Sequence, residues 1–410
     1  MLPLVFTPLD PAFVNNPYSV YAVLREHDPI HRSSMGIWII TRYKDVSAAL
    51  RDPRLSNAPS PYAVVHSRNS HRYVAAQVAN NILPFLDPPK HATSRKLIGQ
   101  AFHTHLNLAP ADVHMIATRL LDRCRAKGEM DVISDFATPL SIAVIGQILG
   151  IPEQDLTQLK IWSEAFFYLF SAIPSDDVLD RLECALAEFR HYLSGLILER
   201  RNNPTNDLIS TLVQASDGNY RLNETELIDT AMLLFSDGVE NVDSGIGNSV
   251  AALLANPSEL KRLQEQPQLI QRAVDECLRF ESPAQYIPRV ALEDIAVGEK
   301  LIRKNAGVFL VLASANRDAA QFTDPDRLDI TREPNPHLSF GRGRHSCIGA
   351  PLVRQEIEFG ITVILHNLQD LKQMNPVLEW MPRAGHRWLA SLPVTFSPYL
   401  VAIFVTNFAP

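Results

Sequence analysis

The sequence has few cysteines, and their spacing argues against the usual cysteine-based sites. There are only four, Cys124, Cys184, Cys277 and Cys347, and no two of them form a C-x-x-C pair. Zinc sites and redox-active dithiols commonly use that spacing, so neither is indicated here. We therefore expect the chain to work in a reducing compartment.

Dense positive charge and long apolar segments are also missing. The formal net charge is -7 and no stripe of Lys and Arg is present, so we expect no nucleic-acid partner. The first residues lack a cationic start, and Pro3 and Pro8 interrupt their apolar run, so they resemble neither a signal peptide nor a membrane anchor. Residues 399–405 are apolar but far shorter than the roughly 20 residues that span a bilayer, and we interpret them as a buried terminal strand. We expect a cytoplasmic protein with no membrane partner.

No Gly/Ser-rich linker, charge block or low-complexity tract divides the chain. The 29 prolines are spread along it rather than concentrated at one boundary. The length of 410 residues is only a weak indication of more than one domain, and the lack of linkers favours a single domain over residues 1–410. With 46% hydrophobic residues, that domain can bury a large core.

Apolar residues recur at helical spacing over most of the chain. The predicted helices cover residues 17–27, 44–51, 110–126, 138–149, 155–170, 178–201, 206–215, 258–281 and 352–369. Strand-like runs occur at 36–41, at 307–312 and in the C-terminal apolar stretch. Strands and helices do not alternate regularly, which argues against a doubly wound sheet. The predicted fold class is mainly α with a minor β part.

One predicted helix is much longer than the others. Asn223 is a suitable N-cap, Glu226 completes a capping box, and the helical pattern continues to Asn256, just before Pro257. Such a helix is roughly 50 Å long, enough to cross a domain. Its ends are apolar, but residues 236–244 in its middle include polar and acidic groups. These groups are costly in a core unless they meet water, pair with arginines or serve a function.

A glycine-rich segment near the C-terminus surrounds a single cysteine. Residues 336–356 read PHLSFGRGRHSCIGAPLVRQE. The glycines allow the backbone to turn tightly and to approach a flat cofactor. A helical pattern begins directly after Cys347, which places its sulfur at a helix N-terminus, where the dipole favours a thiolate. A thiolate bound to iron promotes O–O cleavage. A cysteine in an isolated glycine-rich loop is more often inert, but here some ten positions agree in spacing.

This segment resembles the haem-binding loop of cytochromes P450, whose pattern is F-G-x-G-x-[H/R]-x-C-x-G. The matching positions are Phe340, Gly341, Gly343, His345, Cys347 and Gly349. The resemblance implies that Cys347 is the thiolate ligand of a haem b iron and that His345 contacts a propionate. Phe340 and Gly349 are expected to bind the cofactor too. The resemblance also implies the cytochrome P450 fold, with the long helix on the distal side of the haem.

Further positions match the family's haem contacts. Residues 87–95 resemble the helix whose His and Arg hold the haem propionates, which implies those roles for His91 and Arg95. Arg289 lies in a segment that matches a third propionate contact.

A buried ion-pair cluster is also implied by the resemblance. Glu276 and Arg279 match the family's E-x-x-R pair, and Arg327 matches the arginine that completes the cluster. An E-x-x-R pair alone is common on helix surfaces and is worth only a few tenths of a kcal/mol. The order and spacing of all these segments carry the resemblance.

The middle of the long helix departs from the family pattern. Family members usually show A/G-G-x-D/E-T-T/S, whereas residues 237–242 read DGVENV. By resemblance, Gly238 lets the helix open to admit O2, and Glu240 connects the site to solvent protons. Asn241 replaces a threonine that orients oxygen, and an amide relays protons less readily than a hydroxyl. We predict that Asn241, with a water or a substrate hydroxyl, supplies the donor instead. Asp237 either meets a polar substrate group or pairs with a cation.

The resemblance also locates a substrate pocket for a small to medium apolar molecule. Its expected lining is Leu234, Phe235, Asp237, Ala284, Ile287, Trp388 and Leu389, with regions 62–85 and 166–170. As in bacterial-type members, a separate ferredoxin or flavodoxin with its NAD(P)H-dependent reductase is expected to supply electrons. Arg342, Arg344 and Lys96 are expected to provide positive charge for its docking.

Three functions remain open from the sequence. The first is an O2-dependent monooxygenase that hydroxylates or epoxidises its substrate in secondary metabolism or catabolism. The second is a peroxide-using or otherwise atypical haem-thiolate enzyme, suggested by the missing threonine; against it, Glu240 is present where peroxide-dependent members carry an arginine in the distal helix. The third is a haem protein that senses or carries a ligand; a glycine beside an acid argues against it, since storage needs no proton supply.

Overall fold

Strands from two distant parts of the chain form the largest sheet. The computed structural model describes residues 6–106, 110–170, 175–218 and 220–398. The strand order is β1 (Ile30–Arg32), β2 (Trp38–Ile40), β8 (Gly307–Leu310), β5 (Ile287–Ala291) and β3 (Leu55–Ser56). β8 pairs parallel with β2 and antiparallel with β5, which places Arg289 opposite Val308. The sheet thus fixes the backbone of one predicted haem contact.

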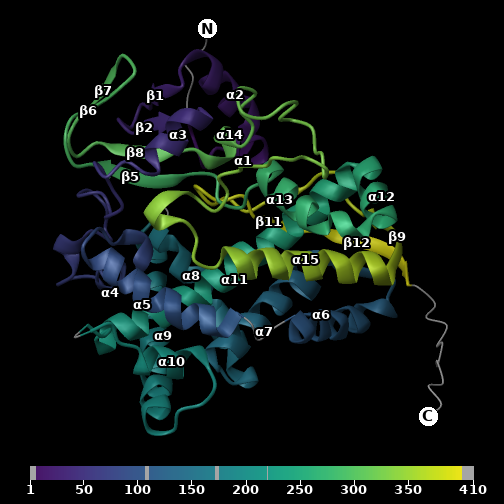
Figure 1. The fold of residues 1–410 in the computed structure, drawn as a ribbon, viewed down its shortest axis with the longest axis horizontal. Coiled ribbons are helices and arrows are strands. Elements are labelled where there is room, and N and C mark those ends of the chain that lie inside the picture. The colour runs from purple at the N-terminus through teal and green to yellow at the C-terminus, as the bar shows by residue number, and fades with distance from the viewer. Residues whose placement is uncertain (1–5, 107–109, 171–174, 219, 399–410) are drawn as a thin grey trace.

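Short helices lie beside this sheet (Figure 1). They are α1 (Pro11–Asn15), α2 (Pro17–His27), α3 (Tyr43–Ala49) and α14 (Leu312–Ala315). α1 and α2 each begin with a proline, whose missing N–H and fixed φ suit the first helical position. Side chains of α3 and the strands, including Val46, Ile40 and Leu310, form a hydrophobic cluster separate from the main core.

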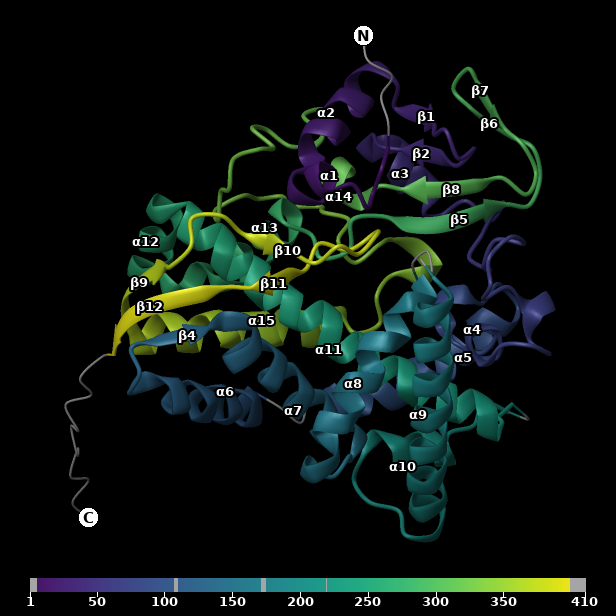
Figure 2. The ribbon, with the colours of Figure 1, turned by 180° about the vertical axis from the view of Figure 1, so that it is seen from behind.

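The long helix α11 (Glu224–Ala255) runs through the middle of the helical part (Figure 2). It begins with the predicted capping box. The Glu226 N–H donates to Oδ1 of Asn223 at 2.9 Å, and the Asn223 N–H donates to the Glu226 carboxylate at 3.0 Å. Most of α11 is buried because several helices pack against it. These are α7 (Thr138–Leu149), α8 (Leu156–Phe166), α9 (Asp176–Asn202), α13 (Ile270–Phe280) and α15 (Ala350–Asn367).

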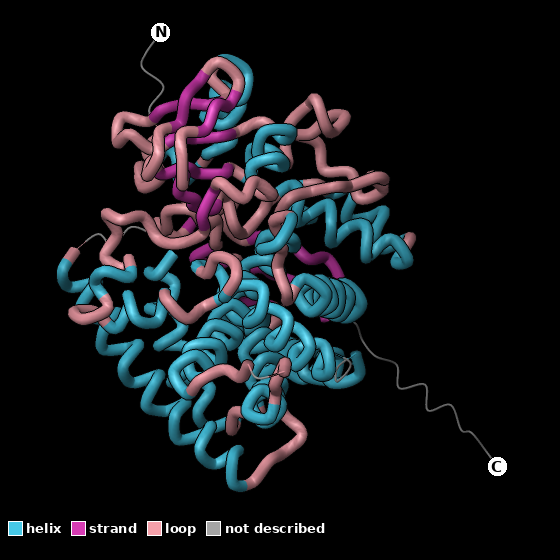
Figure 3. The backbone as a smooth tube through the Cα atoms, turned by 60° about the vertical axis from the view of Figure 1, so that its left-hand side comes forward, coloured by secondary structure: helices cyan, strands magenta, loops and turns pink. Residues whose placement is uncertain are grey.

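The remaining elements surround this core. The helices are α4 (Val74–Ala79), α5 (Lys90–His105), α6 (Pro110–Arg125), α10 (Leu208–Gln214) and α12 (Pro257–Glu265). Smaller sheets join β4 (Glu129–Asp131), β12 (Pro393–Pro398) and β9 (Leu368–Gln373), then β10 (Glu379–Trp380) with β11 (Leu389–Ser391), and β6 (Ile295–Val297) with β7 (Lys300–Ile302). Figure 3 shows that helices fill one end of the molecule and that most strands gather at the other.

The predicted mainly α fold with a minor β part is confirmed. α2, α3, α6, α7, α9, α10 and α15 end within two residues of the predicted boundaries. The single helix predicted over 258–281 was wrong, because Pro267 separates α12 from α13. The segment 155–170 also changes from α-helix to a 3-10 helix after Phe166.

β2 and β8 lie in the predicted strand segments, but most other strands were missed because two or three residues are too short to show alternation. The predicted C-terminal strand at 399–405 lies outside the described residues. The single domain over residues 1–410 stays a prediction.

One helical stretch of the described residues, Val132–Leu149, is apolar and long enough to cross a membrane. Burial within the protein covers 56% of it. It contains α7, which packs against α11 through Ile145 and Gly238. We interpret it as a core helix, because a membrane span would present its apolar surface to lipid.

Candidate active site

The loop before α15 holds Cys347 in a tightly turned backbone. Gly341 and Gly343 have φ angles of +65° and +80°, which residues with side chains rarely adopt. A Cβ on Gly343 would also lie 2.9 Å from Cγ of Arg51. The N–H of Cys347 donates to the carbonyl of Phe340 at 2.9 Å and closes the loop. Glycine is therefore required here by both backbone conformation and space.

The sulfur of Cys347 lies at the N-terminus of α15. The backbone N–H groups of Gly349 and Ala350 hydrogen-bond it. Burial has the larger effect and raises the pKa of the Cys347 thiol to about 11. The exposed side chain lines a cavity. A thiol in this position is suited to bind a metal ion, which displaces the thiol proton.

The cavity over Cys347 has a volume of about 310 Å³. α5, α11, β5 and the Cys347 loop contribute to its walls. The walls are largely apolar and include Leu83, Phe85, Ile98, Phe102, Ile145, Phe167, Phe170, Leu233, Leu234, Val242, Ala284, Ile287, Leu312, Ile348 and Leu352. Such walls favour a flat apolar cofactor together with an apolar ligand.

Four basic side chains gather at the cavity near Cys347. The rings of His91 and His345 stack with their centroids 3.8 Å apart. Burial and the nearby positive charges of Arg95 and other arginines lower the pKa of His91 to about 4 and that of His345 to about 3. Burial likewise lowers the pKa of Arg289 to about 10. The cavity therefore disfavours positive charge unless an anion enters it.

These side chains fit a haem. Nε2 of His91 and Nε2 of His345 are buried and have no hydrogen-bond partner in the described ranges. Arg95 and Arg289 donate to backbone carbonyls at 2.6 and 2.7 Å instead of to carboxylates. The two propionates of a haem would supply the missing acceptors and negative charge. Cys347 would bind the iron through its sulfur.

Asp237 and Asn241 face the cavity from α11, one helical turn apart. The side-chain amide of Asn241 hydrogen-bonds the Asp237 carboxyl, but burial has the larger effect and raises the pKa of Asp237 to about 7. Within the described part of the chain, Asp237 forms no ion pair, so the expected pairing with a cation is not observed. The sequence already held a signal for this contact, because residues four apart share a helix face.

Glu240 points away from the cavity, toward α8. Its Oε1 accepts hydrogen bonds from Nζ of Lys160 at 2.7 Å and from Oγ of Ser163 at 2.6 Å. Neighbouring positions on a helix face different directions, so Asn241 faces the cavity whereas Glu240 faces α8.

Gly238 allows α7 and α11 to pack closely. A Cβ on Gly238 would lie 2.7 Å from Cγ1 of Ile145. α11 is helical without a break across this position. The expected opening of the helix at Gly238 is therefore not observed, and packing accounts for the glycine.

Part of the expected substrate pocket is corrected. Leu234, Ala284 and Ile287 line the cavity, as do residues from both predicted regions. Three expected residues lie behind the wall, where Phe235 packs edge-on against Phe189, Trp388 packs against Phe167, and Leu389 lies near Gly247. His386, two residues before Trp388, lines the cavity and was missed, because the segment was too irregular for its facing direction to be predicted.

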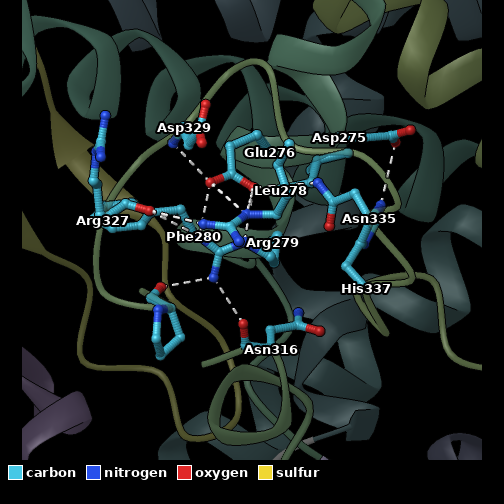
Figure 4. A network of polar contacts seen from close by, with 12 residues as sticks. Asp275, Glu276, Leu278, Arg279, Phe280, Asn316, Arg327, Asp329, Asn335 and His337 are labelled. Atoms are coloured by element: carbon cyan, nitrogen blue, oxygen red, sulfur yellow. Dashed lines mark hydrogen bonds and ion pairs between the residues drawn. The ribbon is translucent and has the colours of Figure 1, made fainter. Parts of the chain in front are cut away.

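Glu276 and Arg279 form a buried ion pair on α13 (Figure 4). Nε and Nη2 of Arg279 donate to the two Glu276 oxygens at 2.7 and 2.8 Å. The expected third member, Arg327, contributes its backbone carbonyl, which accepts from Arg279 at 3.2 Å. The guanidinium that completes the cluster belongs to Arg332, which donates to Glu276 at 3.1 Å. Sequence spacing could not distinguish two arginines five residues apart in an irregular loop.

The basic residues expected to dock an electron donor are partly engaged within the protein. Arg342 donates to the hydroxyls of Tyr43 at 3.3 Å and Ser47 at 3.1 Å. Lys96 forms an ion pair with Asp217 at 2.8 Å. Arg344 lies near enough to the propionate-binding residues to lower the pKa of His345.

Comparisons with known proteins agree with this site. A family model described as Cytochrome P450 matches residues 167–381. The chain is 38% identical to the biotin biosynthesis cytochrome P450 of Bacillus subtilis (strain 168), over 94% of this chain and 97% of that protein. It is 35% identical to the mycinamicin IV hydroxylase/epoxidase of Micromonospora griseorubida, over 92% and 94%.

Solved structures share the fold. P450BioI in complex with an acyl carrier protein ligated to hexadec-9Z-enoic acid superposes with a TM-score of 0.86 and 36% identity, covering 94% of this chain and 99% of that one. The bacillaene polyketide synthase cytochrome P450 PksS of Bacillus subtilis 168 gives a TM-score of 0.87 and 34% identity, covering 96% and 100%.

These matches extend over nearly the whole chain and include enzymes named as hydroxylases. They coincide with a cavity whose sulfur and basic nitrogens fit a haem. The chain therefore belongs to the cytochrome P450 family and is a haem-iron monooxygenase.

Proposed function

We propose that this enzyme binds haem b through Cys347 and hydroxylates or epoxidises a small to medium apolar molecule. The observation that carries the proposal is the apolar cavity that opens directly over the Cys347 sulfur. The substrate carbon that is oxidised would lie against the apolar walls of this cavity. We assign the enzyme to secondary metabolism or catabolism in the cytoplasm.

Several residues around the cavity would bind different parts of the haem. Cys347 would ligate the iron, and the N–H groups of Gly349 and Ala350 would stabilise the thiolate charge. His91, Arg95, Arg289 and His345 would bind the propionates. Phe340 lines the same cavity and would pack against the macrocycle.

When bound, the haem supplies the activation of O2 and the transfer of one oxygen atom to carbon. The apolar walls from α5 and α11 would orient the substrate and exclude water, which limits wasteful consumption of electrons. Asp237 would gain and lose a proton inside the cavity near neutral pH, since burial raises its pKa to about 7. Glu240 accepts a hydrogen bond from Lys160 and would link α11 to α8 beside the cavity wall.

A ferredoxin or flavodoxin with its NAD(P)H-dependent reductase would supply the electrons. We place the docking site beside the Cys347 loop, where Arg344 adds positive charge. The rate of reduction should then fall as ionic strength rises.

The test is the spectrum of the reduced, CO-bound protein. Wild type should show the shift specific to thiolate-ligated haem, and Cys347→Ser should lose that shift while retaining bound haem. Cys184→Ser, at an exposed cysteine remote from the haem contacts, is the matched control. A Cys347→Ser protein with an unchanged spectrum would contradict the proposal. A ligand screen on wild type, including carrier-bound acyl chains like the one seen in the P450BioI structure, would then identify the substrate.

The position of Asn241 favours a second candidate, a peroxide-using enzyme. Its amide bonds to Asp237, and no threonine hydroxyl is present at this position. Turnover with hydrogen peroxide is compared with turnover on NADPH, ferredoxin and reductase. Our proposal requires turnover with NADPH, ferredoxin and reductase to be faster than turnover with hydrogen peroxide. Product formed per NADPH should change in Asn241→Ala and Asn241→Thr, and no change in either would remove Asn241 from the reaction.

A further inference from the structure

The distal wall of the cavity carries a single carboxyl group. Among the cavity-lining residues that the structure describes, Asp237 is the only acidic one. Apolar side chains surround it, including Leu233, Leu234 and Val242 from the same helix. An acidic side chain is not needed to hold an apolar substrate, so this position calls for an explanation of its own.

Among the residues that the structure describes, none forms an ion pair with Asp237. Burial raises its pKa, and the Asn241 hydrogen bond opposes this rise. Two other buried acids on α11 do have cationic partners, since Asp229 pairs with Arg190 at 2.8 Å and Glu240 with Lys160 at 2.7 Å. Asp237 thus differs from both in facing the cavity without a cation.

Asn241 adds a second acceptor beside the carboxyl. Its amide group donates to Asp237, which fixes the orientation of both side chains. Its carbonyl oxygen Oδ1 is then buried and has no hydrogen-bond partner in the part of the chain that the structure describes. The Asp237 carboxyl therefore presents an acceptor to a largely apolar cavity, and a ligand with a donor would satisfy it.

We propose that Asp237 is a specificity-determining residue that binds a hydrogen-bond donor on the substrate, a hydroxyl or an amine N–H carried on an otherwise apolar frame. Asn241 is the positioning residue that holds the carboxyl toward the cavity. This inference rests on the proposed function, because the donor would lie on the distal side of the bound haem. It narrows the substrate class from apolar molecules to apolar molecules with one donor group.

The experiment titrates the haem-loaded enzyme with four probes of similar shape and follows the haem spectrum. 4-Cyclohexylphenol donates through a hydroxyl and 4-cyclohexylaniline through an amine, 4-cyclohexylanisole only accepts, and cyclohexylbenzene does neither. We expect the better donor probe to bind at least about tenfold more tightly than the anisole, a difference of 1.4 kcal/mol. The relative affinities of the phenol and the aniline distinguish a hydroxyl from an amine. A spectrum showing direct nitrogen ligation is scored separately.

Variants separate recognition from folding. Asp237→Leu should reduce the preference for the donor probe to about one while cyclohexylbenzene binds as well as before. Asn241→Val should reduce the preference severalfold, and Asn241→Thr, whose hydroxyl can again donate to the carboxyl, should restore it. Ser236→Ala, at the adjacent buried position that does not line the cavity, should leave it unchanged.

The outcomes are distinguishable from those of the proposed function. A protein without the thiolate-haem spectrum would overturn the proposed function itself. A normal spectrum with a preference near one in wild type, or with the same preference in Asp237→Leu, would overturn the role of Asp237 alone.

Discussion

Burial of a single carboxyl group in α11 makes the stability of the protein depend on pH. The pKa of Asp237 is raised from 3.8 to about 7, so the native state retains a proton there that the unfolded chain loses. Between these two values the native state binds more protons, and stability falls as pH rises. The free-energy cost of burying the ionised carboxyl is complete above pH 7 and absent below about pH 4.

Asp237→Asn should remove this cost. We expect the variant to be more stable than wild type by about 1–3 kcal/mol at pH 8, because each pKa unit corresponds to 1.36 kcal/mol and the cavity hydrates part of the carboxyl. The two proteins should be equally stable near pH 4. Thermal unfolding midpoints of the haem-loaded proteins at both pH values measure this. A difference independent of pH would contradict it.

Glu276 is a residue whose replacement should strongly lower the stability of the protein. Its ion pair with Arg279 has side chains that are 1% and 0% exposed. Glu276→Gln would leave the guanidinium buried without a counter-charge, so we expect about 3–5 kcal/mol of destabilisation. Glu265→Gln, which breaks the exposed pair with Lys261, should cost less than about 1 kcal/mol. Chemical unfolding checks both, and equal costs would show that the buried cluster adds nothing.

Side-chain direction limited what the sequence could predict at this scale. Cys347, His91, Arg95, Arg289 and His345 were predicted to meet, and they line one cavity. Local motifs sufficed for them because the haem-binding loop and its helix have fixed spacing. The direction of Glu240 depends on the helical phase of α11 relative to α8. That phase is set by packing between helices, which no local motif encodes.

At the scale of elements, the contact between α7 and α11 depends on a missing side chain. We expect Gly238→Ala to destabilise the protein by about 1–3 kcal/mol, because the new methyl group would overlap Cγ1 of Ile145. Adding Ile145→Ala should relieve the overlap, so the double variant should be more stable than the sum of the two single effects predicts.

Gly195→Ala is the matched control for this prediction. Gly195 lies on the exposed face of α9, and a Cβ there would meet nothing within 4 Å. The substitution should therefore stabilise the protein by about 0.5–1 kcal/mol, as alanine does in helices. Calorimetry of the wild type, the two single variants at Gly238 and Ile145, their double variant and Gly195→Ala measures these differences in stability. A Gly238→Ala protein as stable as Gly195→Ala would show that the two helices can move apart freely.

Element boundaries were predictable wherever a helix was long and amphipathic. The capping box at Asn223 and Glu226 located the start of α11 to the residue. Short strands such as β5 were not predictable, although β5 carries Arg289. Its position follows from pairing with β8, in which Arg289 lies opposite Val308, 19 residues further along the chain. This pairing forms only in the folded chain.

At the scale of the whole molecule, the proposed haem contacts come from three separate regions. His91 and Arg95 lie on α5, Arg289 lies on β5 of the large sheet, and His345 lies in the Cys347 loop. The sheet has its own hydrophobic cluster, distinct from the core around α11. Haem would thus tie the sheet to the helices across the cavity.

Removal of the haem should therefore weaken the sheet before the helical core. We expect the haem-free protein to melt in two steps and the haem-loaded protein in one step at a higher temperature, because a ligand that binds only the native state stabilises it. Differential scanning calorimetry and hydrogen exchange of β5 and β8 measure this. A single transition at the same temperature in both forms would show that the haem does not join the two parts.

The ion pair between Lys160 and Glu240 joins α8 to α11. Lys160 belongs to α8, which packs on α11 and carries on into Phe167 and Phe170 of the cavity wall, whereas Glu240 belongs to α11 itself. Any outward displacement of α8 would withdraw the ammonium group and leave the carboxylate facing Asp243, whose own pKa is already raised to about 7. Asp243 would then lose the nearby positive charge of Lys160, which favours its ionised form, so Asp243 would take up a proton. Ligand entry from that side would therefore be accompanied by proton uptake, and the apparent affinity of a bulky ligand would depend on pH even if the ligand itself never titrates.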